Sequence, residues 1–98
     1  MNHVTSRGTA ALYYTSGCGH LEIAKILIAA GASVNHAESE NGHTPLVAAA
    51  EEGHLDVVKF LISKGASMDH ICNQGNNLIW FATMNGHLEL VKFLIAKG

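Results

Sequence analysis

Charged residues, proline and cysteine are all scarce in this sequence, and each shortage excludes a class of protein. Charged residues make up 14% of the 98 positions, against about 25% in an average protein, and hydrophobic residues make up 48%. A chain with one proline and this much apolar surface is not a disordered segment, because it must bury that surface. Its length allows one small domain, which excludes a two-domain enzyme.

Net positive charge and long hydrophobic runs are also missing. Six Lys and Arg stand against eight Asp and Glu, so the formal net charge of -2 provides no basic surface for a nucleic-acid backbone. The longest strongly apolar stretches, such as 26–30 and 78–82, fall far short of the roughly 20 residues that a membrane span needs. The polar amino terminus lacks the apolar core of a secretory signal. We therefore predict that the chain does not bind nucleic acid and does not insert into a membrane.

The two cysteines are too few for a fold held together by disulfides. Their scarcity favours a reducing compartment, so we predict a cytoplasmic or nuclear protein. Cys18 and Cys72 are expected to lie too far apart to bond. Cys18, between two glycines, is interpreted as an ordinary side chain, with an exposed reactive thiol as the alternative.

An internal repeat organises the whole chain. Gly-His-Leu recurs at 19–21, 53–55 and 86–88, at spacings of 34 and 33 residues. Each copy continues with an acidic residue, a lysine three positions later and a Leu-Ile pair, and then ends on glycine. We call these units the first, middle and third copies. A period of this length is typical of proteins that stack one supersecondary unit.

The middle copy predicts two helices. Thr44 is a helix N-cap residue and Pro45 suits the first helical position, so a helix is expected from here to about Glu52. A second helix is expected to end at Gly65. Its apolar residues exceed a single stripe, so it must be covered on several sides.

One polar row on this second helix is expected to face water. Asp56 and Lys59 are spaced to form an i,i+3 ion pair, and Ser63 continues the row. The equivalent residues of the other copies repeat the pattern: Glu22, Lys25 and Ala29, then Glu89, Lys92 and Ala96.

Residues 42–67 resemble an ankyrin repeat. They read Gly-His-Thr-Pro-Leu-Val-Ala-Ala-Ala-Glu-Glu-Gly-His-Leu-Asp-Val-Val-Lys-Phe-Leu-Ile-Ser-Lys-Gly-Ala-Ser, and the flanking copies extend the resemblance over nearly the whole chain. The resemblance implies an all-α solenoid of stacked helix-turn-helix units with protruding loops. It implies one domain, 1–98, with repeats at approximately 5–37, 38–71 and 72–98, the last of them incomplete.

The first and third copies depart from the Thr-Pro-Leu-His motif of the family. They read Ala10-Ala11-Leu12-Tyr13 and Asn77-Leu78-Ile79-Trp80 at the positions where the middle copy has Thr44-Pro45-Leu46-Val47. Asn77 can cap its helix, whereas Ala10 cannot.

Neither catalysis nor metal binding is predicted. Nucleophilic catalysis needs a nucleophile, a base and an orienting carboxylate in one pocket, and no motif here brings such groups together. His20, His54 and His87 occupy one position in successive copies, about 8 to 10 Å apart, whereas zinc needs its ligand nitrogens at about 2.0 to 2.1 Å. We interpret these histidines as structural and assign no cofactor.

The resemblance implies a protein-protein interaction module that binds a partner protein or peptide on a concave face, without chemistry of its own. The contact positions that it implies on the loops and at the ends of the inner helices are Arg7, Thr9, Glu40, Asn41, His43, Glu51, Glu52, Gln74, Asn76, Met84 and Asn85.

Two groups of residues could make this face selective. The aromatic pairs 13–14 and 80–81 replace Val47-Ala48 of the middle copy, and they are interpreted as core packing or, alternatively, as an aromatic anchor at Tyr14 or Trp80. Glu38, Glu40, Glu51 and Glu52 are interpreted as a solvated surface or as an acidic patch that selects a basic partner.

Two other readings of the function stay open. The third copy stops in the middle of a repeat and keeps an apolar helix, so the chain is interpreted as a piece of a larger protein, an enzyme or a channel, that it scaffolds. Alternatively, the exposed ends of the solenoid would stack chain on chain.

Overall fold

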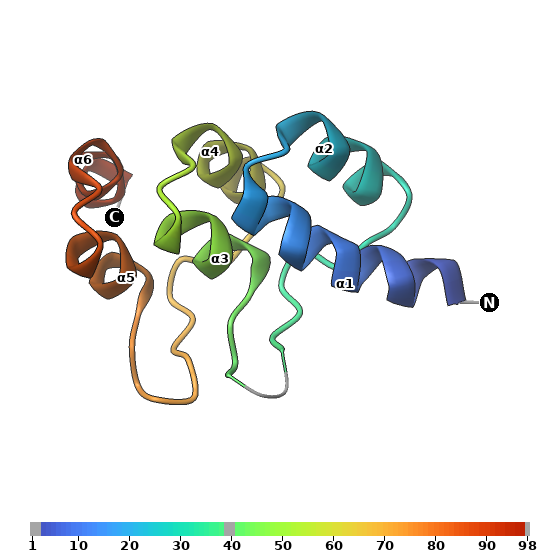
Figure 1. Ribbon diagram of the computed structural model, residues 1–98, viewed down its shortest axis with the longest axis horizontal. Helices are drawn as coiled ribbons and strands as arrows, with labels where there is room; N and C mark the ends of the chain where they lie inside the picture. Colours follow the sequence, from blue (N-terminus) through green and yellow to red (C-terminus); the bar gives the residue numbers. More distant parts are fainter. Residues whose placement is uncertain (1–2, 39–40, 98) are drawn as a thin grey trace.

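The computed structural model describes residues 3–38 and 41–97 and confirms an all-α solenoid. Six helices lie in this part of the chain: α1 (His3–Cys18), α2 (Leu21–Ala29), α3 (Pro45–Glu51), α4 (Leu55–Ser63), α5 (Leu78–Met84) and α6 (Leu88–Lys97). The inner helices α1, α3 and α5 form one row and the outer helices α2, α4 and α6 form a second row (Figure 1). The connections from α2 to α3 and from α4 to α5 project beyond the inner row.

The predicted caps begin α3 and α5. The Thr44 hydroxyl accepts a hydrogen bond from the Val47 N–H at 3.3 Å, and the Asn77 side chain accepts one from the Trp80 N–H at 2.9 Å. Each cap satisfies one of the N–H groups that the first turn of a helix leaves without a partner. The start of both inner helices is therefore encoded locally.

The first inner helix is longer than expected, because nothing in its sequence stops it at Ala10. It begins at His3 and runs through Ala10 and Ala11, where the middle copy has its cap and proline. Proline lacks the N–H that would continue a helix and disfavours helical geometry in the preceding residue, whereas alanine is the strongest helix former. Ala10 does not cap this helix, but the helix does not begin there either, because it starts about two turns earlier, at His3.

This extension also corrects two predicted loop positions. Arg7 and Thr9 lie within α1 and not on a loop. Thr9 is buried, and its hydroxyl accepts a hydrogen bond from the Ser33 N–H at 3.0 Å. Thr9 therefore ties α1 to the segment after α2 and is not a free contact residue.

The second helix of the middle copy, α4, is covered on several sides as predicted. Val57, Val58 and Leu61 are each 0% exposed, and α4 packs against both α2 and α3. All members of the predicted polar row, including Ser63, Ala29 and Ala96, are exposed. Burial and exposure on the outer helices therefore follow the repeat.

The predicted Asp56–Lys59 ion pair is absent, although its equivalents form. Glu22 pairs with Lys25 at 3.4 Å and Glu89 with Lys92 at 3.6 Å. The shorter Asp56 carboxylate instead accepts a hydrogen bond from the Val57 N–H at 2.8 Å, at the start of its helix. The Lys59 ammonium lies 5.4 Å from the centre of the Phe93 ring, where a cation is attracted by the ring face.

Histidine and glycine join one copy to the next. The His54 Nε2–H donates to the Gly17 carbonyl oxygen at 3.1 Å, and His87 donates to the Glu51 carbonyl oxygen at 2.8 Å. The His54 ring packs on Gly19 and the His87 ring on Gly53, so closely that a Cβ on either glycine would lie 2.5 to 2.6 Å from the ring. These two histidines therefore have the structural role that the repeat suggests.

Candidate functional site

A hollow lies between α3 and α5, beneath the two projecting connections. It measures about 320 Å³, and we call it the Trp80 hollow. Its lining residues come from both inner helices and both connections: Asn41, His43, Glu51, Cys72, Gln74, Asn76, Trp80 and Phe81. The connections are held together above it by a hydrogen bond from the Asn73 N–H to the Asn41 carbonyl oxygen at 3.2 Å.

Aromatic rings build one wall of the Trp80 hollow. Trp80 keeps 42% of its surface exposed and packs edge to face on Phe81, with ring centres 5.1 Å apart. Phe81 is buried and contacts the His43 ring in the same way at 5.0 Å. The buried ring thus supports the indole, whose exposed part is available to a ligand.

The opposite wall carries the Glu51 carboxylate. It lies 4.0 Å from His43 Nδ1, close enough for an ion pair when the imidazole is protonated, and none of the described side chains donates a hydrogen bond to it. Two effects raise the pKa of the buried Cys72 thiol above its ordinary value of 9.0. The larger is burial, and the smaller is the negative charge of Glu51. The hollow therefore has an electronegative wall with unused acceptors.

A second hollow lies on the other side of Glu51, between α1 and α3. It measures about 280 Å³, and we call it the Tyr14 hollow; it is lined by Tyr13, Tyr14, Gly17, Cys18, Ala48, Glu51 and Glu52. Tyr14 is 67% exposed and packs edge to face on Tyr13 at 5.1 Å. Two hollows, each with an exposed aromatic ring, thus share one carboxylate.

None of the five lysines lines either hollow or belongs to an inner helix, whereas the one arginine, Arg7, belongs to the inner helix α1. Lys25, Lys59, Lys92 and Lys97 belong to the outer helices, and Lys64 follows the last residue of α4. Glu38, Glu51 and Glu52 lie on the inner helices and their connections. The outer helices nearly balance their four lysines with Glu22, Asp56 and Glu89, so the two faces differ by the surplus of carboxylates beside the inner helices.

The structure brings some of the predicted contact residues together and disperses others. Five of them line the Trp80 hollow: Asn41, His43, Glu51, Gln74 and Asn76. Glu52 lines the Tyr14 hollow. Met84, 63% exposed, and Asn85, whose amide donates to the Phe81 carbonyl oxygen at 2.9 Å, lie at the end of α5 outside both hollows. Glu40 and the side chain of Arg7 lie outside the described residues.

Sequence reasoning did not place Phe81 or Cys72 at this site. For Trp80 and Tyr14, the sequence offers an exposed aromatic anchor only as the alternative to core packing. The signal for Trp80 was its replacement of Val47, which is 1% exposed in the middle copy. No sequence pattern pointed to Cys72, because only the path of the connection between α4 and α5 brings it to the same hollow as Glu51.

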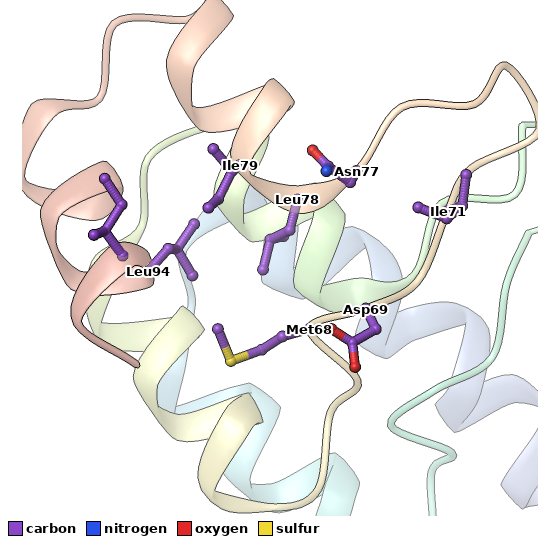
Figure 2. Close-up of a pocket in the computed structure, with 8 residues that line it drawn as sticks. Met68, Asp69, Ile71, Asn77, Leu78, Ile79 and Leu94 are labelled. Atoms are coloured by element: carbon purple, nitrogen blue, oxygen red, sulfur yellow. The ribbon is translucent and has the colours of Figure 1, made fainter. Parts of the chain in front are cut away.

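A third hollow lies at the end of the solenoid, among the start of the inner helix α5, the outer helix α6 and the connection before α5. It measures about 460 Å³ and is lined by Met68, Asp69, Ile71, Asn77, Leu78, Ile79, Leu94 and Ile95 (Figure 2). A smaller, largely apolar hollow of about 260 Å³ next to it is lined by Thr83, Gly86, His87, Leu88 and Val91. We call these two together the end face.

Neither a cluster of metal ligands nor a membrane-spanning helix is found in the part of the chain that the structure describes. No group of three or more His, Cys, Asp or Glu side chains there is arranged to hold a metal ion. No helix there is long and apolar enough to cross a membrane.

Comparison with known families agrees with the repeat pattern and with the fold. A family model described as ankyrin repeats in three copies matches residues 1–72, and a model for a single ankyrin repeat matches residues 74–98. No curated protein is significantly similar to the chain. Ankyrin repeats are generally protein-protein interaction modules, and their domains are typically non-catalytic. The chain belongs to the ankyrin repeat family.

Proposed function

We propose that the chain binds a partner protein or peptide on the surface formed by α1, α3, α5 and the two connections, which we call the inner-helix face. The observation that carries this proposal is Trp80. Its equivalent in the middle copy, Val47, is 1% exposed and packs between copies, whereas Trp80 is 42% exposed at the rim of a hollow. Half-exposed aromatic rings beside a hollow are typical anchors of protein interfaces.

Catalysis has no part in this proposal. The groups that line the Trp80 hollow include one carboxylate, one imidazole and one thiol. The raised pKa of Cys72 keeps this thiol protonated at neutral pH, and a protonated thiol is a poor nucleophile. The residues of this hollow therefore favour binding over covalent chemistry.

The first experiment selects ligands without assuming their chemistry. A random dodecapeptide library is panned against the full chain, and selected peptides are measured against Trp80→Val and Tyr14→Ala. These variants install the middle-copy residues at the same positions, so they preserve the repeat pattern. We expect affinity to fall about tenfold or more, because each change removes an exposed aromatic anchor.

The matched control for this selection is Ile26→Ala, which removes apolar surface that is 66% exposed on the outer helix α2. Selected peptides should bind this variant as they bind the original chain. Peptides that lose affinity with Ile26→Ala but not with Trp80→Val or Tyr14→Ala would place binding on the outer helices and overturn the proposal.

A second candidate function is end-to-end self-association, and the open Gly86 favours it. Gly19 and Gly53 each contact a histidine ring of the following copy, whereas nothing lies within 4 Å of the Cβ position at Gly86. Leu88 and Ile95 on the end face are 64% and 66% exposed. A second chain that offers its exposed His20 would repeat the contact found twice within the chain.

Light scattering over a range of micromolar concentrations tests this association. The average mass should rise with concentration, and Leu88→Lys with Ile95→Lys should restore the monomer, because the two charges oppose burial of the end face. A monomeric mass for the unmodified chain up to about 100 μM would exclude a contact of even modest affinity.

A further inference from the structure

We propose that the inner-helix face recognises an extended peptide through two cationic side chains, arginine or lysine, three residues apart, which occupy the Trp80 hollow and the Tyr14 hollow and share the Glu51 carboxylate. This inference rests on the proposed function and adds the chemistry of the partner. It follows from the contents of each hollow, the distribution of charge and the distance between the hollows.

The Trp80 hollow combines the two groups that a guanidinium prefers. Glu51 and Trp80 both line this hollow, and 42% of the Trp80 surface is exposed. A planar guanidinium binds a carboxylate through paired hydrogen bonds and stacks on an aromatic ring, and tryptophan is the best such ring. Gln74 and Asn76, with side-chain amide oxygens, line the mouth and can accept further N–H groups.

The Tyr14 hollow repeats this combination with different residues. The exposed Tyr14 ring lines this hollow together with two carboxylates. One belongs to Glu51, which also lines the Trp80 hollow, and the other to the exposed Glu52. This hollow has two carboxylates and no nearby lysine. It suits a second cation of either type, since ammonium groups as well as guanidinium groups bind carboxylates and tyrosine rings.

The carboxylates at the two hollows make the inner-helix face selective for a cationic partner. A peptide with cationic side chains is attracted to Glu51 and Glu52, whereas the lysines of the outer helices are nearly matched by acidic residues. An acidic peptide is repelled by Glu51 and Glu52. Long-range attraction of this kind acts mainly on the rate of association and weakens as salt is added.

The spacing of the two hollows sets the spacing of the two cations. The hollows flank α3, one on the α1 side and one on the α5 side. Adjacent packed helices lie about 8 to 10 Å apart, so the hollows are separated by about this distance. In a polyproline II segment, residues three apart point to the same side and are separated by about 9.3 Å. An Arg-x-x-Arg segment in this conformation therefore matches both hollows.

Trp80, the sole tryptophan, makes the test direct because its fluorescence reports on one of the hollows. The probe is the peptide acetyl-Gly-Pro-Arg-Pro-Pro-Arg-Pro-Gly-amide. Its first control carries citrulline, which is neutral and has nearly the shape of arginine, at both arginine positions. Its second control has the same composition with the two arginines adjacent. The protein variants are Glu51→Gln and, as a matched control on the outer helix α6, Glu89→Gln.

We expect the Arg-Pro-Pro-Arg probe to change the Trp80 fluorescence and to bind about tenfold more tightly than either control peptide. Glu51→Gln should weaken the probe by about tenfold, Glu89→Gln by less than about twofold, and raising the salt concentration should weaken it further. Equal affinity for the citrulline peptide, or for Glu51→Gln, would overturn the cationic inference.

The two proposals can fail separately. If the citrulline peptide binds as tightly as the probe and both change the Trp80 fluorescence, peptide binding on the inner-helix face stands and cationic recognition falls. If the probe leaves Trp80 unchanged up to about 1 mM, near the weakest affinity of a specific complex, cationic recognition falls as well. The library selection then decides, from its own variants, whether the inner-helix face binds peptides of another kind.

Discussion

Leu61→Ala is expected to lower the free energy of unfolding by about 3 kcal/mol, because it leaves a cavity at the centre of the solenoid. Leu61 is 0% exposed in α4, the outer helix of the middle copy, which packs against α2 and α3. Neighbouring backbones are fixed by the stacking of copies on both sides, so the cavity cannot easily collapse. The measurement is the midpoint and slope of urea denaturation.

The control for this change is Leu88→Ala, which removes the same atoms from an outer helix. Leu88 is 64% exposed in α6, so its truncation creates no cavity and should cost no more than about 0.5 kcal/mol. Similar losses for the two variants would contradict the structure, because they would mean that Leu61 is no better packed than a surface residue.

Gly53→Ala is expected to cost about 1.5 to 3.5 kcal/mol, from two separate causes. Gly53 has φ +79, in the left-handed region, where any other L-residue is strained by about 1 to 2 kcal/mol. Its new Cβ would also lie 2.5 Å from His87 Nδ1, so the ring must move. That movement breaks the His87 hydrogen bond to the Glu51 carbonyl oxygen, worth about 0.5 to 1.5 kcal/mol.

The matched control is Gly86→Ala, which separates the two causes. Gly86 has nearly the same conformation, φ +73, but nothing lies within 4 Å of its Cβ position. It should therefore cost the backbone strain alone, about 1 to 2 kcal/mol. Urea denaturation of both variants measures the difference, and Gly53→Ala should in addition loosen α5 and α6, seen as faster amide exchange there. Equal effects at the two positions would show that the histidine contact contributes nothing.

The sequence by itself determined the features that depend on short stretches of chain. The glycine-histidine period predicted the stacked units, and Thr44, Pro45 and Asn77 marked where α3 and α5 begin. It also predicted the row of exposed residues on the outer helices. These features need only the hydrogen-bonding groups and backbone preferences of neighbouring residues, which act in the same way in every copy.

Local reasoning failed where two conformations compete closely. Ala10 and Ala11 offered no cap, but the same residues let α1 continue back to His3. Asp56 had the right spacing for an ion pair with Lys59, yet a backbone N–H and the Phe93 ring provided alternative partners for the two side chains. Exposed ion pairs contribute too little free energy to prevail over such partners.

The candidate binding site was only partly predictable for a different reason. Family resemblance named Glu51, His43 and Gln74, but not that they surround one hollow with Trp80 and Cys72. Phe81 is buried and Trp80 is exposed, although both are apolar neighbours in α5. Which of them faces the middle copy depends on how far each copy is rotated and displaced from the last. That relation is a property of packed side chains from all three copies, and only the tertiary structure decided it.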